Sequence, residues 1–498
     1  MSLQPLGIVV AYLLLALGVG LVAYRVGGSD AEDFYLASRT LGTLVLLFTT
    51  FATLLSAFTF FGGPNLAYQA GPEWILVMGV MDGVLFAILW YVIGYRQWLI
   101  GRAREYVTLG EMLGDRFASP GLRGLVAGVS LLWLFPYVML QQMGAGEALR
   151  GLTGGAVPYW GGAALITLFM IAYVMLAGLR GVAWTDTLQG LFMLSVLWVA
   201  VVWILGSLGG LGAATRGMVA ANPDFASLGG GLYTPQFIIS SAVTIAFGVT
   251  MFPQINQRFF VAKSATVLKR SFALWPVLVL LLFVPAFMLG AWAAGLPIEV
   301  PEGANVLSVL LSEYTPGWFA ALVVAGAMAA MMSSSDSMLL SGSAYFTRDL
   351  YRPFVRPEAS DRREAWIARI GVAVFALLAF AASLSRPGTL IEVGDTAFSG
   401  FALLAPPVIV ALYWEATTRD GMLVGVAVPQ ILYLLHVLVP TVSVAVGDTT
   451  VSLLARSYAG WDVALAFMIL AAVLTVGVSL VSSPAIDEDA ARFAVGGD

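Results

Sequence analysis

The chain has no cysteine and only one histidine, His436, among its 498 residues. Without cysteine there can be no disulfide scaffold, thiolate metal site or thiol nucleophile. A single histidine argues against a zinc site and against a Ser-His-Asp triad. Walker and GxGxxG loops are also missing, which argues against ATP-driven pumping. We therefore do not expect an enzyme.

Charge is the second shortage. Only 11% of the residues are charged, whereas soluble domains carry about 25%. The net charge of -5 gives no reason to expect a nucleic-acid partner. Instead, 60% of the residues are hydrophobic and the mean hydropathy is +0.90. A soluble fold is excluded, and the natural unit of this chain is the membrane span of about 20 residues.

Thirteen apolar stretches are long enough to cross a bilayer. The first has no basic residue before it and no cleavage signature, so we expect a retained helix rather than a signal peptide. The fold class is thus an all-α polytopic membrane protein. The stretches run over residues 5–24, 42–70, 74–95, 121–149, 156–178, 184–208, 236–258, 271–295, 316–345, 367–385, 393–414, 421–440 and 460–482.

The basic residues predict the orientation of these spans. With the N-terminus outside, the outer segments hold only Arg150, Arg216, Arg386 and Arg456, and the inner segments hold the other 20 of the 24. Positive charge favours the cytoplasmic side. We therefore expect the N-terminus outside, the C-terminus in the cytoplasm, and location in the plasma (inner) membrane.

Two stretches contain helix breakers. The second stretch carries Gly62, Gly63 and Pro64, and the seventh carries Gly248 and Pro253. Each could be a simple kink. The two stretches lie five spans apart, an odd number, so they cross in opposite directions. This pattern is typical of two inverted five-helix repeats that each begin with a broken helix.

The ninth stretch is rich in serine. Ala330, Ser333, Ser334, Ser337 and Ser341 are spaced by three or four residues and share one helix face. The face could serve helix–helix packing, with each hydroxyl bonding back to its own helix. It could also bind sodium, a hard cation that prefers oxygen ligands, together with carbonyls freed by the break in the second stretch.

Acidic residues inside the spans are few, and such residues are often functional. They are Asp82, Glu147, Asp186, Asp336 and Asp395. Glu147 and Asp395 lie near the outer surface and could be merely solvated. Asp186 and Asp336 both fall toward the inner half of the membrane.

Four motifs together resemble the sodium/solute symporter family over essentially the whole chain. The strongest is AAMMSSSDSMLLSGSAYFTRDLY (329–351), followed by GLRGVAWTDTLQG (178–190) and FPQINQRFFVAKS (252–264). SAFTFFGGPNLAYQAG (56–71) resembles the pantothenate and monocarboxylate branches. The resemblance implies a five-plus-five inverted-repeat core of the amino-acid-transporter type that works by alternating access.

The resemblance also implies a sodium site, which is the expected cofactor. Carried over residue by residue, its ligands are Ala52, Leu55, Ala330, Ser333 and Ser334, the first two through backbone carbonyls.

The chain departs from some relatives at two places. Leu54 stands where some carry a polar or acidic residue, which argues against the proline-type arrangement. Phe58 and Thr59 stand where sugar-type relatives carry polar groups, so a polyol substrate is less expected.

A second cation site is a further hypothesis. Asp186, Asp336, Ser333 and Ser337 could hold a second Na⁺ or a proton, because two nearby carboxylates need a cation between them. The alternative is that Asp186 caps its helix and pairs with Arg180, while Asp336 is a buried, protonated carboxyl.

The substrate site is expected near mid-membrane beside the two breaks. Its mostly neutral lining favours a small monocarboxylate or related organic acid, with an amino acid next. The candidate residues are Ser56, Thr59, Phe60, Asp82, Gln142, Thr250, Met251 and Gln254.

The leading function is a sodium-coupled symporter that imports a small organic solute, with proton coupling as a variant. A non-coupled channel or ligand sensor is the alternative, and a membrane-embedded enzyme is a weak third. Solute, sodium and the lipid bilayer are the expected partners, and a single copy should suffice. We expect one transporter domain, 1–498, made of an extra helix 5–24, repeats 42–208 and 236–414, and two final helices within 421–482.

Overall fold

The computed structural model describes residues 4–26, 35–301, 304–439, 442–446, 449–453 and 457–482, and most of them are helical. The long helices are α1 (Gln4–Val26), α8 (Pro120–Leu152), α9 (Tyr159–Ser207), α11 (Pro235–Met251), α13 (Ala265–Ala293), α15 (Gly317–Ala344), α17 (Asp361–Ser383), α20 (Arg419–Leu438) and α21 (Val463–Val481).

Shorter helices and turns connect these long helices. The short helices are α3 (Thr43–Leu54), α4 (Gly63–Ala70), α5 (Asp82–Leu89), α6 (Tyr95–Arg104), α7 (Leu109–Arg116), α10 (Leu211–Ala221), α12 (Pro253–Phe260), α14 (Val306–Tyr314), α16 (Arg352–Phe354), α18 (Leu390–Ala402) and α19 (Ala405–Tyr413). Wider π-helical turns are η2 (Phe58–Gly62), η3 (Leu76–Met81), η4 (Trp90–Gly94) and η6 (Tyr345–Tyr351), and 3-10 turns are η1 (Ala37–Arg39) and η5 (Pro223–Ala226).

The prediction of a multi-pass helical membrane protein is confirmed. Within the described residues, ten helices are long and apolar enough to cross a bilayer, or up to twelve if each of two bent helix pairs is one span. The predicted stretch 156–178 contains a shorter apolar helix, Tyr159–Met175.

The first bent pair joins α3 to η2 and α4 at an angle of 61°. The helix ends at Leu54, and Leu55 is extended, with φ −75° and ψ 128°. The break therefore lies ahead of the predicted Gly62, Gly63 and Pro64, and that part of the prediction was wrong. Pro64 sits in the first turn of α4, where a missing amide hydrogen costs little. A side chain at Gly63 would run into the ring of Phe287.

The second bent pair joins α11 to α12 at 57°. Here the break falls at Phe252, which is extended immediately before Pro253, as expected for a residue that precedes proline. Gly248, also predicted as a breaker, lies inside α11. Its role is close packing, since a side chain there would collide with the carbonyl of Phe398 in α18.

The helical assignment of α9 runs through two predicted spans. At about 1.5 Å per residue, twelve residues of a straight helix cover roughly 18 Å. The hydroxyl of Tyr173 nevertheless lies 2.5 Å from that of Thr185 and 3.2 Å from the carbonyl of Gly181. The chain therefore bends sharply between the arms Tyr159–Met175 and Gly181–Ser207.

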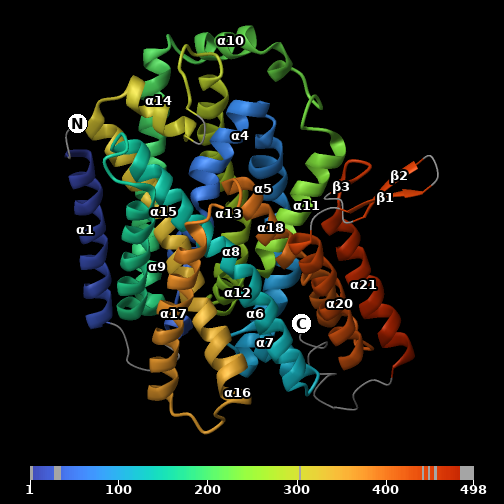
Figure 1. Ribbon diagram of the computed structural model, residues 1–498. Helices are drawn as coiled ribbons and strands as arrows, with labels where there is room; N and C mark the ends of the chain where they lie inside the picture. The colour runs from blue at the N-terminus through green and yellow to red at the C-terminus, as the bar shows by residue number, and fades with distance from the viewer. Residues whose placement is uncertain are drawn as a thin grey trace.

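Helix α15 occupies the middle of the bundle. It packs against α9, α8, α1, α3 and α17, and all of its residues from Val323 to Ala344 are buried. Helix α1 lies along one edge of the bundle and α20 and α21 along the opposite edge (Figure 1). Helix α10 lies across one end, and α16 lies at the other (Figure 1).

Two connections carry structure that the sequence analysis did not predict. Between α20 and α21, strands β1 (Val442–Val446) and β2 (Thr449–Leu453) pair antiparallel, and β3 (Ser457–Tyr458) pairs with β4 (Trp461–Asp462). The serine-rich helix also continues through η6 into α16.

Candidate functional site

The break between α3 and η2 is held by side chains from two other helices. The amide of Ala57 donates to Oε1 of Gln141 in α8 at 2.9 Å. The hydroxyl of Ser334 in α15 lies 2.8 Å from the carbonyl oxygen of Thr53 and also within hydrogen-bonding distance of that of Leu55. Backbone carbonyls released by the broken helix thus meet a serine hydroxyl inside the membrane.

The predicted sodium ligands fall into three groups. Leu55 and Ser334 meet through the contact just described. Ser333, the neighbouring serine, donates instead to Oδ1 of Asp186 at 2.5 Å. Ala52 and Ala330 are fully buried in α3 and α15, two helices that pack together.

The serines of α15 are used in different ways. Ser335 bonds the carbonyl of Met331 four residues earlier, which is the purely structural pattern. Ser333, Ser334 and Ser337 instead reach across to groups on other helices. Hydroxyls and carbonyls without full charge are suitable ligands for a hard monovalent cation, so the donor set fits sodium.

Asp186 in α9 forms the centre of a polar cluster. Its Oδ2 accepts from Thr49 at 2.5 Å and pairs with Nη2 of Arg258 at 3.3 Å. Nη2 also lies 2.6 Å from the hydroxyl of Ser337 and 2.9 Å from that of Thr53. The residues of this cluster are almost completely buried. The partner of Asp186 is therefore Arg258; the side chain of Arg180 lies outside the described residues.

Two other predicted acids, Asp82 and Asp336, are buried with carboxyl oxygens that have no partner among the described residues. Within the described part of the chain, both carboxyl oxygens of Asp82 lack a hydrogen-bond partner, and so does Oδ1 of Asp336. The structure brings Asp186, Ser333 and Ser337 together, but no hydrogen bond joins Asp336 to them.

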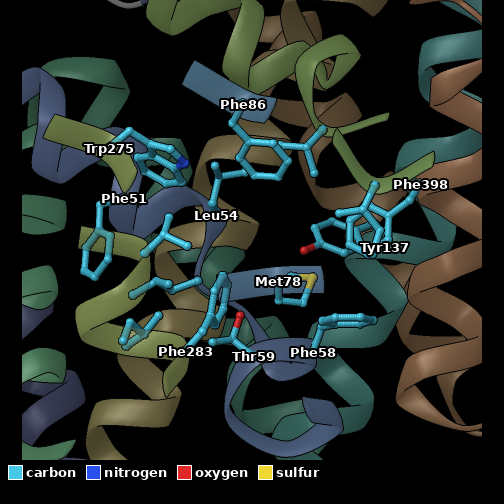
Figure 2. A pocket seen from close by; sticks show the side chains of 15 residues that line it. Phe51, Leu54, Phe58, Thr59, Met78, Phe86, Tyr137, Trp275, Phe283 and Phe398 are labelled. Atoms are coloured by element: carbon cyan, nitrogen blue, oxygen red, sulfur yellow. The ribbon is translucent and has the colours of Figure 1, made fainter. Parts of the chain in front are cut away.

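A cavity lies beside the break in α3. Its wall is mostly aromatic and aliphatic, with the hydroxyls of Thr59 and Tyr137 as the polar groups that stand out (Figure 2). Phe398 packs against Tyr137 and against Phe58, with ring centroids 5.3 Å apart in both pairs. The lining residues are Phe51, Leu54, Leu55, Phe58, Thr59, Met78, Phe86, Tyr137, Ile245, Val249, Trp275, Val279, Leu282, Phe283 and Phe398.

Of the predicted substrate residues, Thr59 is the one that lines this cavity. Ser56 is adjacent, since Tyr137 donates to its hydroxyl at 3.1 Å. Gln142 points elsewhere, with its Nε2 bonded to Thr167 and to the carbonyl of Ala376.

The remaining substrate candidates are fully buried outside the cavity wall. The hydroxyl of Thr250 bonds back to the carbonyl of Ala246 in its own helix. The others are Phe60, Asp82, Met251 and Gln254.

Sequence reasoning missed several site residues. Arg258 is one of the basic residues that the sequence assigns to the inner side, and its position in the sequence does not distinguish it from the others. Gln141 and Tyr137 lie one and five positions before the predicted Gln142, and no pattern distinguished them. The residues of α13 that line the cavity, including Trp275, are aromatic or aliphatic. Their sequence therefore gives no sign of a binding site.

Two membrane helices broken in mid-span, with freed carbonyls meeting a serine-rich helix, define the class of the protein. This architecture belongs to secondary transporters built from discontinuous helices. The model of the sodium:solute symporter family matches residues 34–428, and the chain belongs to that family. It is a transporter rather than an enzyme, and its function is sodium-coupled solute import.

Curated relatives cover most of the chain. It is 29% identical over 440 residues to the sodium/pantothenate symporter of Escherichia coli (strain K12), covering 87% of this chain and 90% of that protein. It is 29% identical over 452 residues to the sodium/proline symporter of Haemophilus influenzae, covering 84% and 85%.

Solved structures share the fold. A Na⁺-coupled sialic acid symporter in a substrate-bound outward-open state superposes with a TM-score of 0.78 at 20% identity, covering 97% of this chain and 99% of that one. Mhp1, a nucleobase-cation-symport-1 family transporter, gives 0.61 at 15% identity, covering 94% and 99%. At these identities the likeness concerns the fold alone.

Proposed function

We propose that the protein uses one sodium site at the break of α3 to drive uptake of a small organic acid. The ligands would be the carbonyls of Ala52, Leu55 and Ala330 and the hydroxyls of Ser333 and Ser334. The observation that carries this proposal is the approach of Ser334 to the freed carbonyls of Thr53 and Leu55. The carbonyl oxygens of Thr53 and Leu55 now share the hydroxyl proton of Ser334. A bound Na⁺ would replace that proton as their partner.

The solute would occupy the cavity beside this site. Thr59, Tyr137 and the adjacent Ser56 can bond a polar group, and the aromatic wall can cover an apolar body. Pantothenate and proline, named for the two relatives, are both carboxylic acids. Within the acids we favour a monocarboxylate, with an amino acid as the second choice. The remaining predicted residues would pack behind the side chains that line the cavity. They are Phe60, Asp82, Gln142, Thr250, Met251 and Gln254.

The architecture that we propose has thirteen spans. Counting each bent pair as one span gives up to twelve, and Tyr159–Met175 supplies the thirteenth. Residues 42–208 and 236–414 would form the two inverted repeats, each opening with a broken helix. Residues 5–24 and 421–482 would flank this core as parts of the same transporter domain.

The orientation places the N-terminus outside and the C-terminus in the cytoplasm of an inner membrane. In this orientation α10 lies on the outer side and α16 on the cytoplasmic side. These two helices lie at opposite ends of the bundle, as an odd number of spans between them requires (Figure 1), and the basic residues assign the end that carries α16 to the cytoplasm.

Uptake into proteoliposomes tests the proposed function. With pantothenate, proline and small monocarboxylates as radiolabelled solutes, an inward Na⁺ gradient should drive accumulation above equilibrium, and an equal K⁺ gradient should not. Flux that only equilibrates, whatever the Na⁺ or H⁺ gradient, would indicate a channel. Accumulation driven by protons alone would contradict the sodium site.

A further inference from the structure

Nη2 of Arg258 lies inside a shell of four oxygen atoms. The hydroxyls of Ser337, Thr53 and Thr49 are 2.6, 2.9 and 3.1 Å away, and Oδ2 of Asp186 is 3.3 Å away. These groups belong to α3, α9 and α15, whereas Arg258 comes from α12. Each of the five side chains is at most 1% exposed.

The shell has the composition of a site for a small cation. Three hydroxyls and one carboxylate oxygen are hard ligands with one negative charge among them. Asp186 and Ser337, with Ser333, are also residues for which the sequence suggested a second cation. The positive charge that balances Asp186 comes from the protein itself.

We propose that Arg258 is the permanent occupant of this second cation position, so that each transport cycle is coupled to a single Na⁺. The inference rests on the proposed function. A sodium ion in the shell would lie next to the guanidinium, and the repulsion between like charges is strong in a buried, weakly polar environment. Ser333 cannot recruit the ion alone, because its hydroxyl is bonded to Oδ1 of Asp186.

The first sodium site does not suffer from this competition. Ser334 faces the carbonyls of Thr53 and Leu55 rather than Asp186. Ser334 therefore lies at the position that can accept sodium, and its neighbour Ser333, a ligand of the same proposed site, lies between that position and the filled one.

Removing the guanidinium should convert the shell into a sodium site. In Arg258→Met the apolar length of the side chain is kept, but the four oxygens lose their cation and Asp186 is left unpaired, which is strongly destabilising in a buried place. Sodium can then supply the missing charge. Arg258→Lys keeps a positive charge there and is the matched control.

The coupling number is the decisive measurement. Reversal potentials of solute flux in proteoliposomes under imposed Na⁺ gradients should give one Na⁺ per solute in the unmodified protein. Two Na⁺ per solute would overturn the inference while leaving sodium-coupled import intact. Absence of any Na⁺-driven uptake would instead refute the proposed function.

The variants give an independent readout. The melting temperature of purified Arg258→Met should drop in choline chloride and recover in NaCl with a steeper sodium dependence than that of the unmodified protein. Its coupling number should rise to two, and Arg258→Lys should stay at one. A ratio of one in folded Arg258→Met would overturn the inference. If this variant cannot be isolated, the ratio in the unmodified protein decides.

Discussion

Ser334 of α15 and Leu55, the residue that follows α3, are 279 positions apart, yet the serine hydroxyl lies against the leucine carbonyl. The carbonyl is available because the backbone turns extended at Leu55 and leaves the helical hydrogen-bond pattern. A helix break therefore becomes a polar site only when a second helix presents a suitable group at the same depth.

Ser334→Ala should weaken sodium activation of transport. Losing one hydroxyl from a buried set of ligands costs roughly 1–3 kcal/mol, which corresponds to about a 5- to 150-fold rise in the half-saturating Na⁺ concentration. Ser335→Ala is the matched control, because that buried hydroxyl bonds its own helix. Uptake measured against Na⁺ concentration checks this, and equal half-saturation in both variants would contradict the sodium site.

Tyr137→Phe should impair the solute site more than the sodium site. It removes the hydroxyl that lies in the cavity wall and donates to Ser56. The half-saturating solute concentration should rise about tenfold, as expected for loss of one hydrogen bond, while sodium dependence changes little. Tyr413→Phe is the control, since its hydroxyl bonds the carbonyl of Val92 outside the cavity. An unchanged solute dependence would exclude Tyr137 from the site.

Gly248→Ala should destabilise the protein, because the added methyl group meets the backbone carbonyl of Phe398, which cannot rotate away. Overpacking of this kind costs typically about 1–3 kcal/mol. Gly128→Ala in α8 is the control: nothing lies within 4 Å of its new methyl group, and alanine is the better helix former by about 1 kcal/mol. Melting temperatures in detergent should fall for the first variant and not for the second.

Single-cysteine labelling tests the proposed orientation, and the native chain has no cysteine to interfere. Leu228 and Val355 are 78% and 68% exposed, in the segments assigned to the outer and cytoplasmic sides. A membrane-impermeant maleimide applied to intact cells with the outer membrane permeabilised should label Leu228→Cys. It should label Val355→Cys only after the inner membrane is opened. The reverse pattern would invert the topology.

The sequence was most informative where one residue type repeats. The serine spacing of α15 and the alternation of basic residues needed only helical periodicity and the cost of moving charge across lipid. The broken helices were also found, but the first break was placed too late. Glycine and proline at 62–64 are tolerated because neighbouring helices approach them closely, and the actual break at Leu55 has no helix-breaking residue.

The cavity and the Asp186 cluster were harder to predict because they depend on tertiary contacts. Arg258 resembles any basic residue at the inner end of a span until α12 is seen to be buried on all sides. Likewise, the rotation of α8 turns Gln141 toward the break after α3 and Gln142 toward α17. A single sequence does not show how a helix is rotated against its neighbours.

The two breaks differ in how their carbonyls are satisfied. At the second break, Nδ2 of Asn256 bonds the carbonyls of Thr250 and Phe252, so that joint is closed by its own segment of chain. At the first break, the freed carbonyls depend on Ser334 from a different helix. A sodium ion can displace a hydrogen-bond donor that comes from a different helix more readily than one that lies on the same turn as the carbonyl. If the two inverted repeats that we propose arose by duplication, only the first break kept an exchangeable contact, and the proposed transport cycle has a single point at which sodium enters.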